Sequence, residues 1–225
     1  MSESKDSPQP TSSGRSVSYG QARELTLVDR FGVYLSARAV RRYLRSAPSS
    51  RKPSVLDLGC GYHASMLRAL EPDIARGVAV DVALSPDLAE SGKIETLESP
   101  LDEALPRIAD DSVDLVLLLS VLEHLWNPLE ILSGCARVLR PGGAFLLNVP
   151  TWTGKTLLEI SAFRFGWSPR LEIDDHKMYY SRRDLWPLLV RAGFKPSEIR
   201  LRYHKFGLNL FGVVSTTTPA LGSPG

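Results

Sequence analysis

Cysteine is scarce in this sequence, and long apolar runs are missing from it. Only two cysteines occur among 225 residues, Cys60 and Cys135, and neither has a partner at the C-x-x-C spacing. We therefore expect neither a disulfide framework nor a zinc site built from thiolates. The longest apolar run, residues 115–119, is far shorter than the roughly 18 residues that a membrane-spanning helix requires.

The first residues, MSESKDSPQPTSSGRS, are polar and lack the basic and then apolar pattern of a secretory signal. Together with the short apolar runs, this predicts a soluble, cytoplasmic protein with no membrane span.

Net charge is also small, at +2, but it is unevenly distributed. Residues 1–52 carry 10 Lys or Arg against 4 Asp or Glu, residues 53–150 carry 6 against 15, and residues 151–225 carry 11 against 6. A basic flank can steer anionic substrates, although solvated helix faces explain the same pattern. Binding of duplex nucleic acid calls for a strong basic patch, so a nucleic-acid partner is not expected.

Short apolar runs alternate with amphipathic stretches through most of the chain. The runs with the length of a strand are residues 54–58, 77–81, 94–97, 112–119, 144–150, 197–203 and 208–215. Most are apolar on both faces, and amphipathic segments such as 63–70 and 128–139 separate them. This pattern predicts an α/β fold with a doubly wound, mostly parallel seven-stranded sheet of the Rossmann-like type.

One domain, residues 21–215, is predicted between two disordered tails at 1–20 and 216–225, which are polar and lack apolar periodicity. The predicted parts of the domain are an N-terminal helical cap at 21–50, a core at 53–150, an insertion at 151–180, and a C-terminal helix with strands at 181–215. The aromatic-rich insertion follows the fifth strand, where open α/β sheets place their ligand crevice. We interpret it as a substrate cover, with an ordinary packed helix pair as the alternative.

A glycine-rich turn follows the first predicted strand. In VLDLGCGYHAS, Gly59, Gly61 and Ala64 satisfy the pattern G-x-G-x-x-G/A, and such a turn brings backbone N–H groups close to a ligand. The carboxylate of Asp57 would oppose the pyrophosphate of a dinucleotide such as NAD, whereas it suits a positively charged ligand. Asp81, 20 residues after Gly61, is placed like the acid that accepts the ribose hydroxyls in nucleoside-binding sheets.

Five segments occur in an order and spacing that is specific to one enzyme family. They are LDLGCG (56–61), the strand-end Asp81, DSVDLVLLLSVLEHLWNP (111–128), RVLRPGG (137–143) and LLNVP (146–150). This set, which covers about residues 53–150, resembles the class I S-adenosylmethionine-dependent methyltransferases. HKMYYSRRDLWPLLVRAGF, at 176–194, resembles the segment that follows in the subgroup with an L-E-H motif after the fourth strand.

The resemblance implies a site for S-adenosylmethionine as the cofactor. Asp57 would hold the positive end of the methionine moiety, while Gly59 and Gly61 would allow close approach of the backbone. Asp81 would bind the ribose. The other implied contacts are Val82 on the adenine, Asp102 at the adenine amino group, and Ser120, Val121 and Leu122 near the sulfonium.

Two histidines are candidates for the catalytic base, because an imidazole titrates near neutral pH. His124 lies just past the fourth strand, on the rim where the acceptor is expected, and His176 lies on the predicted cover. The alternative for His124 is a structural role in fixing its loop. His63 stands where many family members have a third glycine, and we expect it to begin the following helix.

We do not expect a metal site, although three residues could contribute to one. Glu123, His124 and His176 could form a mixed carboxylate and imidazole site, as in relatives that carry the motif E-x-x-E-H. Ser120 replaces the first glutamate of that motif, so a ligand is missing.

The predicted function is S-adenosylmethionine-dependent methyl transfer to a hydroxyl or amine of a small-molecule acceptor. The reaction requires alignment of donor and acceptor, and removal of a proton from a hydroxyl acceptor. Two alternatives remain open. The chain could methylate RNA or a phosphorylated or sugar-bearing carrier, or it could be a non-catalytic regulator that binds S-adenosylmethionine.

Overall fold

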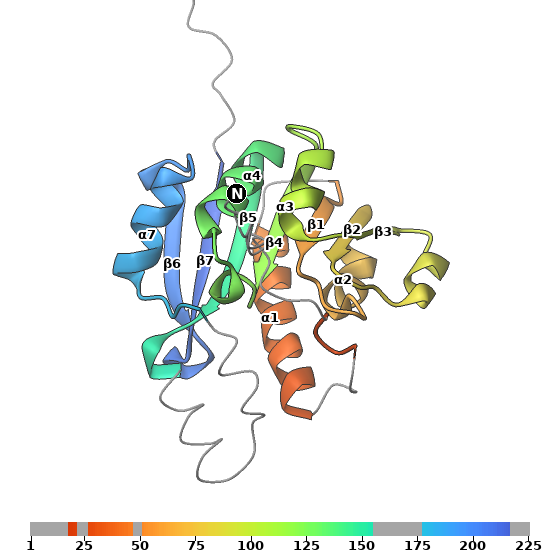
Figure 1. The fold of residues 1–225 in the computed structure, drawn as a ribbon, viewed down its shortest axis with the longest axis horizontal. Helices are drawn as coiled ribbons and strands as arrows, with labels where there is room; N and C mark the ends of the chain where they lie inside the picture. Colours follow the sequence, from red (N-terminus) through yellow and green to blue (C-terminus); the bar gives the residue numbers. More distant parts are fainter. Residues whose placement is uncertain (1–17, 22–26, 47–50, 155–176, 217–225) are drawn as a thin grey trace, which may run out of the picture.

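The computed structural model describes residues 18–21, 27–46, 51–154 and 177–216, which form a seven-stranded sheet with helices on both faces (Figure 1). The strands are β1 (Ser54–Leu58), β2 (Arg76–Asp81), β3 (Ile94–Glu98), β4 (Val113–Leu119), β5 (Leu139–Pro150), β6 (Ile199–His204) and β7 (Asn209–Ser215). The α-helices are α1 (Leu27–Ser46), α2 (Ser65–Leu70), α3 (Leu101–Ala104), α4 (Pro128–Val138) and α7 (Arg182–Arg191). The predicted α/β fold class is confirmed.

The sheet has the order β3-β2-β1-β4-β5-β7-β6. The first five strands pair in parallel, and β7 runs antiparallel between β5 and β6. The chain therefore builds outward from β1 to β3 and then returns to the other side of β1 with β4. In open α/β sheets, ligands bind beyond the carboxyl ends of the strands at such a switch point.

Alternate residues of the central strands enter two hydrophobic layers, as the period of two in a strand requires. Val55 of β1 and Leu115 of β4 pack in the layer covered by α1 and α2. Leu56 and Val116, the next residue in each strand, pack in the layer covered by α4 and α7. Because both faces are covered, the strands read as nearly continuous apolar runs.

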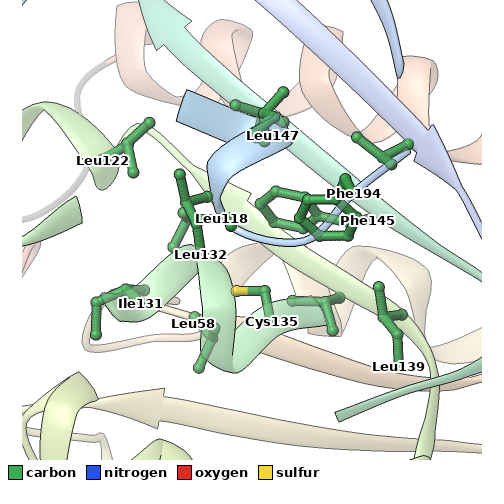
Figure 2. Packing of buried hydrophobic residues seen from close by; sticks show 14 of the residues in the cluster. Leu58, Leu118, Leu122, Ile131, Leu132, Cys135, Leu139, Phe145, Leu147 and Phe194 are labelled. Atoms are coloured by element: carbon green, nitrogen blue, oxygen red, sulfur yellow. The ribbon is translucent and has the colours of Figure 1, made fainter. Parts of the chain in front are cut away.

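Figure 2 shows the layer beneath α4. Cys135 of α4 and Leu118 of β4 lie within it, and Phe145 of β5 stacks on Phe194, with ring centroids 5.5 Å apart. Burial of a large apolar side chain stabilises a fold by about 1.5–3 kcal/mol. This layer therefore holds α4 and the end of α7 firmly against β4 and β5.

Two boundaries differ from the sequence-based prediction for local reasons. α2 begins at Ser65 and not at His63, because Ala64 adopts a left-handed conformation with φ of 44°. The segment RPGG, which separates the predicted helical segment 128–139 from the predicted strand 144–150, lies within β5, where Gly142 has φ of 81° and the pairing register with β4 shifts.

The predicted start of the C-terminal helix is confirmed. Ser181 caps α7, its hydroxyl accepting from the backbone N–H of Arg183 while Asp184 accepts from the Ser181 backbone. Gly193 follows the helix with φ of 106°. Among the helices that the structure describes, none has the length and apolar character needed to span a bilayer.

Candidate active site

A cavity of about 580 Å³ lies at the carboxyl-terminal ends of β1, β2 and β4. Its volume falls in the range of small-molecule binding sites. The first half of α1 and the connection between β6 and β7 complete its walls, and both elements lie toward the lower end of the sheet in Figure 1. The cavity thus lies where the topology predicts a ligand crevice.

Two glycines shape the turn between β1 and α2. Gly59 and Gly61 have φ of 69° and 75°, a conformation that side chains rarely adopt. A Cβ atom on Gly59 would lie 2.5 Å from Val121 Cγ2, and one on Gly61 would lie 3.2 Å from the carbonyl oxygen of Tyr19. Glycine is therefore favoured at both positions by the backbone conformation, by the close approach of Val121 to Gly59, and by that of Tyr19 to Gly61.

Residues 18–20, predicted as part of the N-terminal tail, pack against this turn. The backbone N–H of Tyr62 donates to the carbonyl oxygen of Tyr19 over 2.9 Å, and Tyr19 lines the cavity. Residues 1–17 lie outside the described part of the chain.

Asp81 ends β2 and points into the same turn. Its Oδ2 accepts a hydrogen bond of 2.8 Å from the backbone N–H of Gly61, and its Oδ1 accepts one of 2.8 Å from the backbone N–H of Val82. An ionised carboxylate offers about four lone-pair positions. Two of them remain for donors from the cavity, which Asp81 and Val82 both line.

Asp57 lies near the end of β1 with only 2% of its surface exposed, and it lines the cavity. Its Oδ2 has no hydrogen-bond partner among the described residues. Burial, and then the charge of Asp81, raise the pKa of Asp57 to about 7. Buried polar atoms are almost always paired in native proteins, so this carboxyl fits a cavity ligand that carries a donor or a positive charge.

The turn after β4 forms the opposite wall. Ser120 has φ of 59°, and Asn148 of β5 holds it with two hydrogen bonds. The backbone N–H of Ser120 donates to the Asn148 carbonyl oxygen over 2.8 Å, and the Asn148 side-chain amide donates to the Ser120 hydroxyl over 3.2 Å. Ser120 and Val121 line the cavity. Leu122 is fully buried in the layer beneath α4 and lies away from the cavity wall.

Glu123 and His124 follow in a short 3₁₀ turn, Leu122–His124. They are 2% and 7% exposed, respectively, yet both line the cavity. The Glu123 carbonyl oxygen accepts a 2.7 Å hydrogen bond from the backbone N–H of Lys177, which fixes residues 177–180 at this rim. His176 and the greater part of the predicted cover lie outside the described residues.

One predicted adenine contact is not on the wall. Asp102 lies in the first turn of α3, whereas Ser99 and Leu101 line the cavity at this point. His63, expected to begin a helix, lines the cavity ahead of α2 and packs edge-on against Tyr62. The predicted residues that the structure brings together on one cavity are Asp57, Gly59, Gly61, Asp81, Val82, Ser120, Val121 and His124.

Within the described ranges, no group of three or more His, Cys, Asp or Glu side chains is arranged to hold a metal ion. Because His176 lies outside those ranges, metal independence stays a prediction.

Two walls of the cavity were not predicted from the sequence. The missed residues are Phe31, Gly32, Leu35 and Ser36 of α1, together with Lys205, Leu208 and Asn209 of the β6–β7 connection. The apolar periodicity of α1 identifies a packed helix but does not tell which cavity it borders. For the second wall the sequence did contain one signal, because Gly207 between two predicted strands indicates a tight turn.

Comparisons with known proteins identify methyltransferases among the relatives of this chain. A probable S-adenosylmethionine-dependent methyltransferase of Mycolicibacterium smegmatis is 31% identical over 176 residues, which cover 74% of this chain and 61% of that protein. Another, from Mycobacterium tuberculosis, is 34% identical over 160 residues, covering 68% and 52%. The chain thus spans only about half to three-fifths of the length of these relatives.

Solved structures share the fold. A SAM-dependent methyltransferase from Archaeoglobus fulgidus superimposes with a TM-score of 0.61 at 17% identity, covering 82% of this chain and 94% of that one. The Burkholderia thailandensis 1,6-didemethyltoxoflavin-N1-methyltransferase, solved with 1,6-didemethyltoxoflavin and S-adenosylhomocysteine, gives 0.59 at 20% identity, covering 84% and 80%. At these identities the likeness establishes a Rossmann-like methyltransferase fold.

A family model described as a methyltransferase domain matches residues 29–199, well over half of the sequence. The model does not define the subgroup with the L-E-H motif, which stays a prediction. The chain belongs to the methyltransferase-domain family.

Proposed function

We propose that this chain transfers a methyl group from S-adenosylmethionine to a hydroxyl or amine of a small organic acceptor. The observation that carries the proposal is the buried carboxyl of Asp57, whose Oδ2 lacks a partner among the described residues at the wall of the cavity. Its neighbour Asp81 lines the same cavity, and each of its oxygens accepts one backbone hydrogen bond and can accept another.

These two acids fit the two ends of the cofactor. An ammonium group beside Asp57 satisfies the unpaired oxygen and favours the ionised carboxyl, while a ribose diol supplies the two donors that Asp81 lacks. A dinucleotide would instead bring its pyrophosphate to a turn flanked by two carboxyls, and like charges repel at that distance. Asp57 therefore supports S-adenosylmethionine over NAD, whereas Asp81 suits the ribose of either ligand.

Bound S-adenosylmethionine supplies an electrophilic methyl group on a sulfonium sulfur. The chain's own task is to align the acceptor and to take up its proton. His124, buried at the rim of the same cavity, carries an imidazole suited to accept that proton. A histidine in this position favours an enzyme over a non-catalytic regulator.

A small acceptor suits the dimensions and lining of the cavity. About 580 Å³ must hold the cofactor and the acceptor together, and the wall from α1 is mainly apolar. The structural neighbour from Burkholderia, solved with a small heterocyclic compound, uses the same fold in this way.

Calorimetry with the full chain tests the cofactor first. We expect S-adenosylmethionine and S-adenosylhomocysteine to bind and NAD to give no saturable heat. A mass-spectrometric screen of hydroxyl- and amine-bearing metabolites, read as acceptor mass plus one methyl group, then tests the reaction. Tighter binding of NAD would refute the proposal, and cofactor binding with no acceptor methylated would favour the regulator.

A further inference from the structure

The connection between β6 and β7 turns through three successive residues with left-handed backbone. Lys205, Phe206 and Gly207 have φ of 49°, 59° and 88°. Glycine adopts this conformation freely, whereas lysine and phenylalanine are strained in it. Strain of this kind persists where the surrounding structure holds it, and it clusters at ligand sites.

The turn directs its two large side chains to different environments. Phe206 is 97% exposed, at the mouth of the cavity, whereas Lys205 is half-buried in the cavity wall. The Lys205 Nζ lies 3.7 Å from the point that a Cβ atom on Gly32 would occupy. A larger side chain at position 32 would extend into the space in front of this ammonium.

Gly32 lies inside α1, where glycine is less favourable than alanine. A strained lysine and a helical glycine, each locally unfavourable, therefore meet at one point of the cavity. Both residues line the cavity, so the Lys205 ammonium group lies at the cavity wall beside a helix position that has no side chain.

The ammonium has no close counter-ion. Across the described ranges, it takes part in no hydrogen bond and no ion pair within 4 Å, although the charge of Glu123 acts on it from farther away. Burial lowers the pKa of Lys205, and Glu123 partly offsets this effect. A cation removed from water without a close partner is unfavourable, and an anion from the cavity would relieve that cost.

We propose that Lys205 binds an anionic oxygen group of the acceptor, a carboxylate or a similar oxyacid, and so selects acidic acceptors. The rest of this wall is mainly apolar: Phe31 and Leu35 lie near Gly32 on α1, and Leu208 follows the turn, with Ser36 and Asn209 as its polar members. The acceptor is therefore an amphiphile with an apolar body and one acid group. The inference rests on the proposed methyl transfer, since it names the acceptor class for that reaction.

Two fluorescent probes with the same apolar body isolate the contribution of charge. 8-Anilinonaphthalene-1-sulfonate carries a sulfonate, and N-phenyl-1-naphthylamine is its uncharged counterpart. Both are titrated into the full chain, with and without saturating S-adenosylhomocysteine, which fills the cofactor end. The wild-type protein should bind the anion more tightly than the neutral probe by roughly tenfold to a hundredfold, the range of a charge-assisted hydrogen bond.

Lys205→Met should bring the two affinities close together, and Lys205→Arg should keep the preference. Lys52→Met is the matched control, because Lys52 is exposed and precedes β1, at the end of the strand opposite the cavity. It should leave the affinities for both probes unchanged. Gly32→Leu, which fills the space before the ammonium, should also reduce the preference and serves where Lys205→Met does not fold.

A wild-type anion preference that survives in both Lys205→Met and Gly32→Leu would overturn the inference. So would an absent preference in the wild-type protein, or equal loss of both probes in Lys205→Met, which would give Lys205 a structural role. Failure of S-adenosylhomocysteine to bind the wild-type protein is a separate result, and it contradicts the proposed methyl transfer itself.

Discussion

The backbone N–H of Gly61 donates a hydrogen bond of 2.8 Å to Oδ2 of Asp81, joining the turn after β1 to the end of β2. Both the approach of the backbone and the direction of the carboxylate are therefore set before a ligand arrives. Groups that are already ordered lose less conformational freedom on binding. This relationship makes the Asp81 carboxylate the natural first target for mutation.

Asp81→Ala should weaken the binding of S-adenosylhomocysteine by roughly tenfold to a hundredfold, because charge-assisted hydrogen bonds contribute about 1.5–3 kcal/mol. Calorimetry measures the change directly. Asp87→Ala is a matched control, since Asp87 is exposed and pairs with Arg68 outside the cavity. Unchanged affinity in Asp81→Ala would remove Asp81 from the cofactor site.

The raised pKa of Asp57 predicts that this residue stabilises the unliganded protein less as pH rises. The folded state holds this proton up to about pH 7, whereas the ordinary aspartate pKa is 3.8. Asp57 in the folded state therefore binds more protons between these values, so its contribution to the free energy of unfolding falls as pH rises from about 4 to 7. Asp57→Asn abolishes the titration, so it should raise the melting temperature at pH 8 by roughly 5 °C or more while matching wild type near pH 4.

Cofactor affinity should show the opposite trend, because an ammonium group needs the ionised carboxylate. Below pH 7, the affinity of wild-type protein for S-adenosylhomocysteine should fall by up to about tenfold per pH unit. Asp57→Asn should bind weakly at every pH and give a flat profile. A flat profile in the wild-type protein would contradict the role of Asp57.

The part of the cavity around Asp57 and Asp81 was predictable because its geometry follows from local rules. A strand, two glycines with positive φ and an acid at the end of the next strand specify the positions of Asp57, Gly59, Gly61 and Asp81 almost without tertiary information. The cap at Ser181 is local in the same sense, since Ser and Asp three residues apart satisfy the first turn of a helix.

The rest of the site depends on contacts that sequence patterns do not encode. Ser120 has a positive φ, so the alternation of side chains between the two faces of β4 ends at this residue. Val121 then lines the cavity, whereas Leu122 enters the core. The roles of Gly32 and Lys205 arise only because α1 packs beside a turn more than 150 residues later. Neither residue stands in a motif of its own.

Methyl transfer should survive removal of divalent metal. Ser120 stands where the motif E-x-x-E-H has its first glutamate, and the described residues contain no three-ligand cluster. Activity measured after dialysis against EDTA should equal that of untreated protein, and added magnesium should change it little. Loss with EDTA and recovery with magnesium would make Glu123 and His124 metal ligands and would change the mechanism.

His124 should contribute to turnover and not to cofactor binding. It lies buried at the rim of the cavity, beyond Ser120 and Val121, where an acceptor would approach the methyl group. General-base catalysis is worth roughly 10²- to 10⁴-fold, so His124→Ala should lower the single-turnover rate by about that factor. The affinity for S-adenosylhomocysteine should change little.

His124→Gln separates the two ways in which this histidine could act. An amide accepts a hydrogen bond but is not a useful base, so partial activity in His124→Gln would indicate that positioning of the acceptor dominates. Activity as low as in His124→Ala would indicate proton removal. Near wild-type turnover in His124→Ala would transfer the role to His176 or to simple proximity, and lost cofactor binding would make His124 a structural residue of the cavity wall.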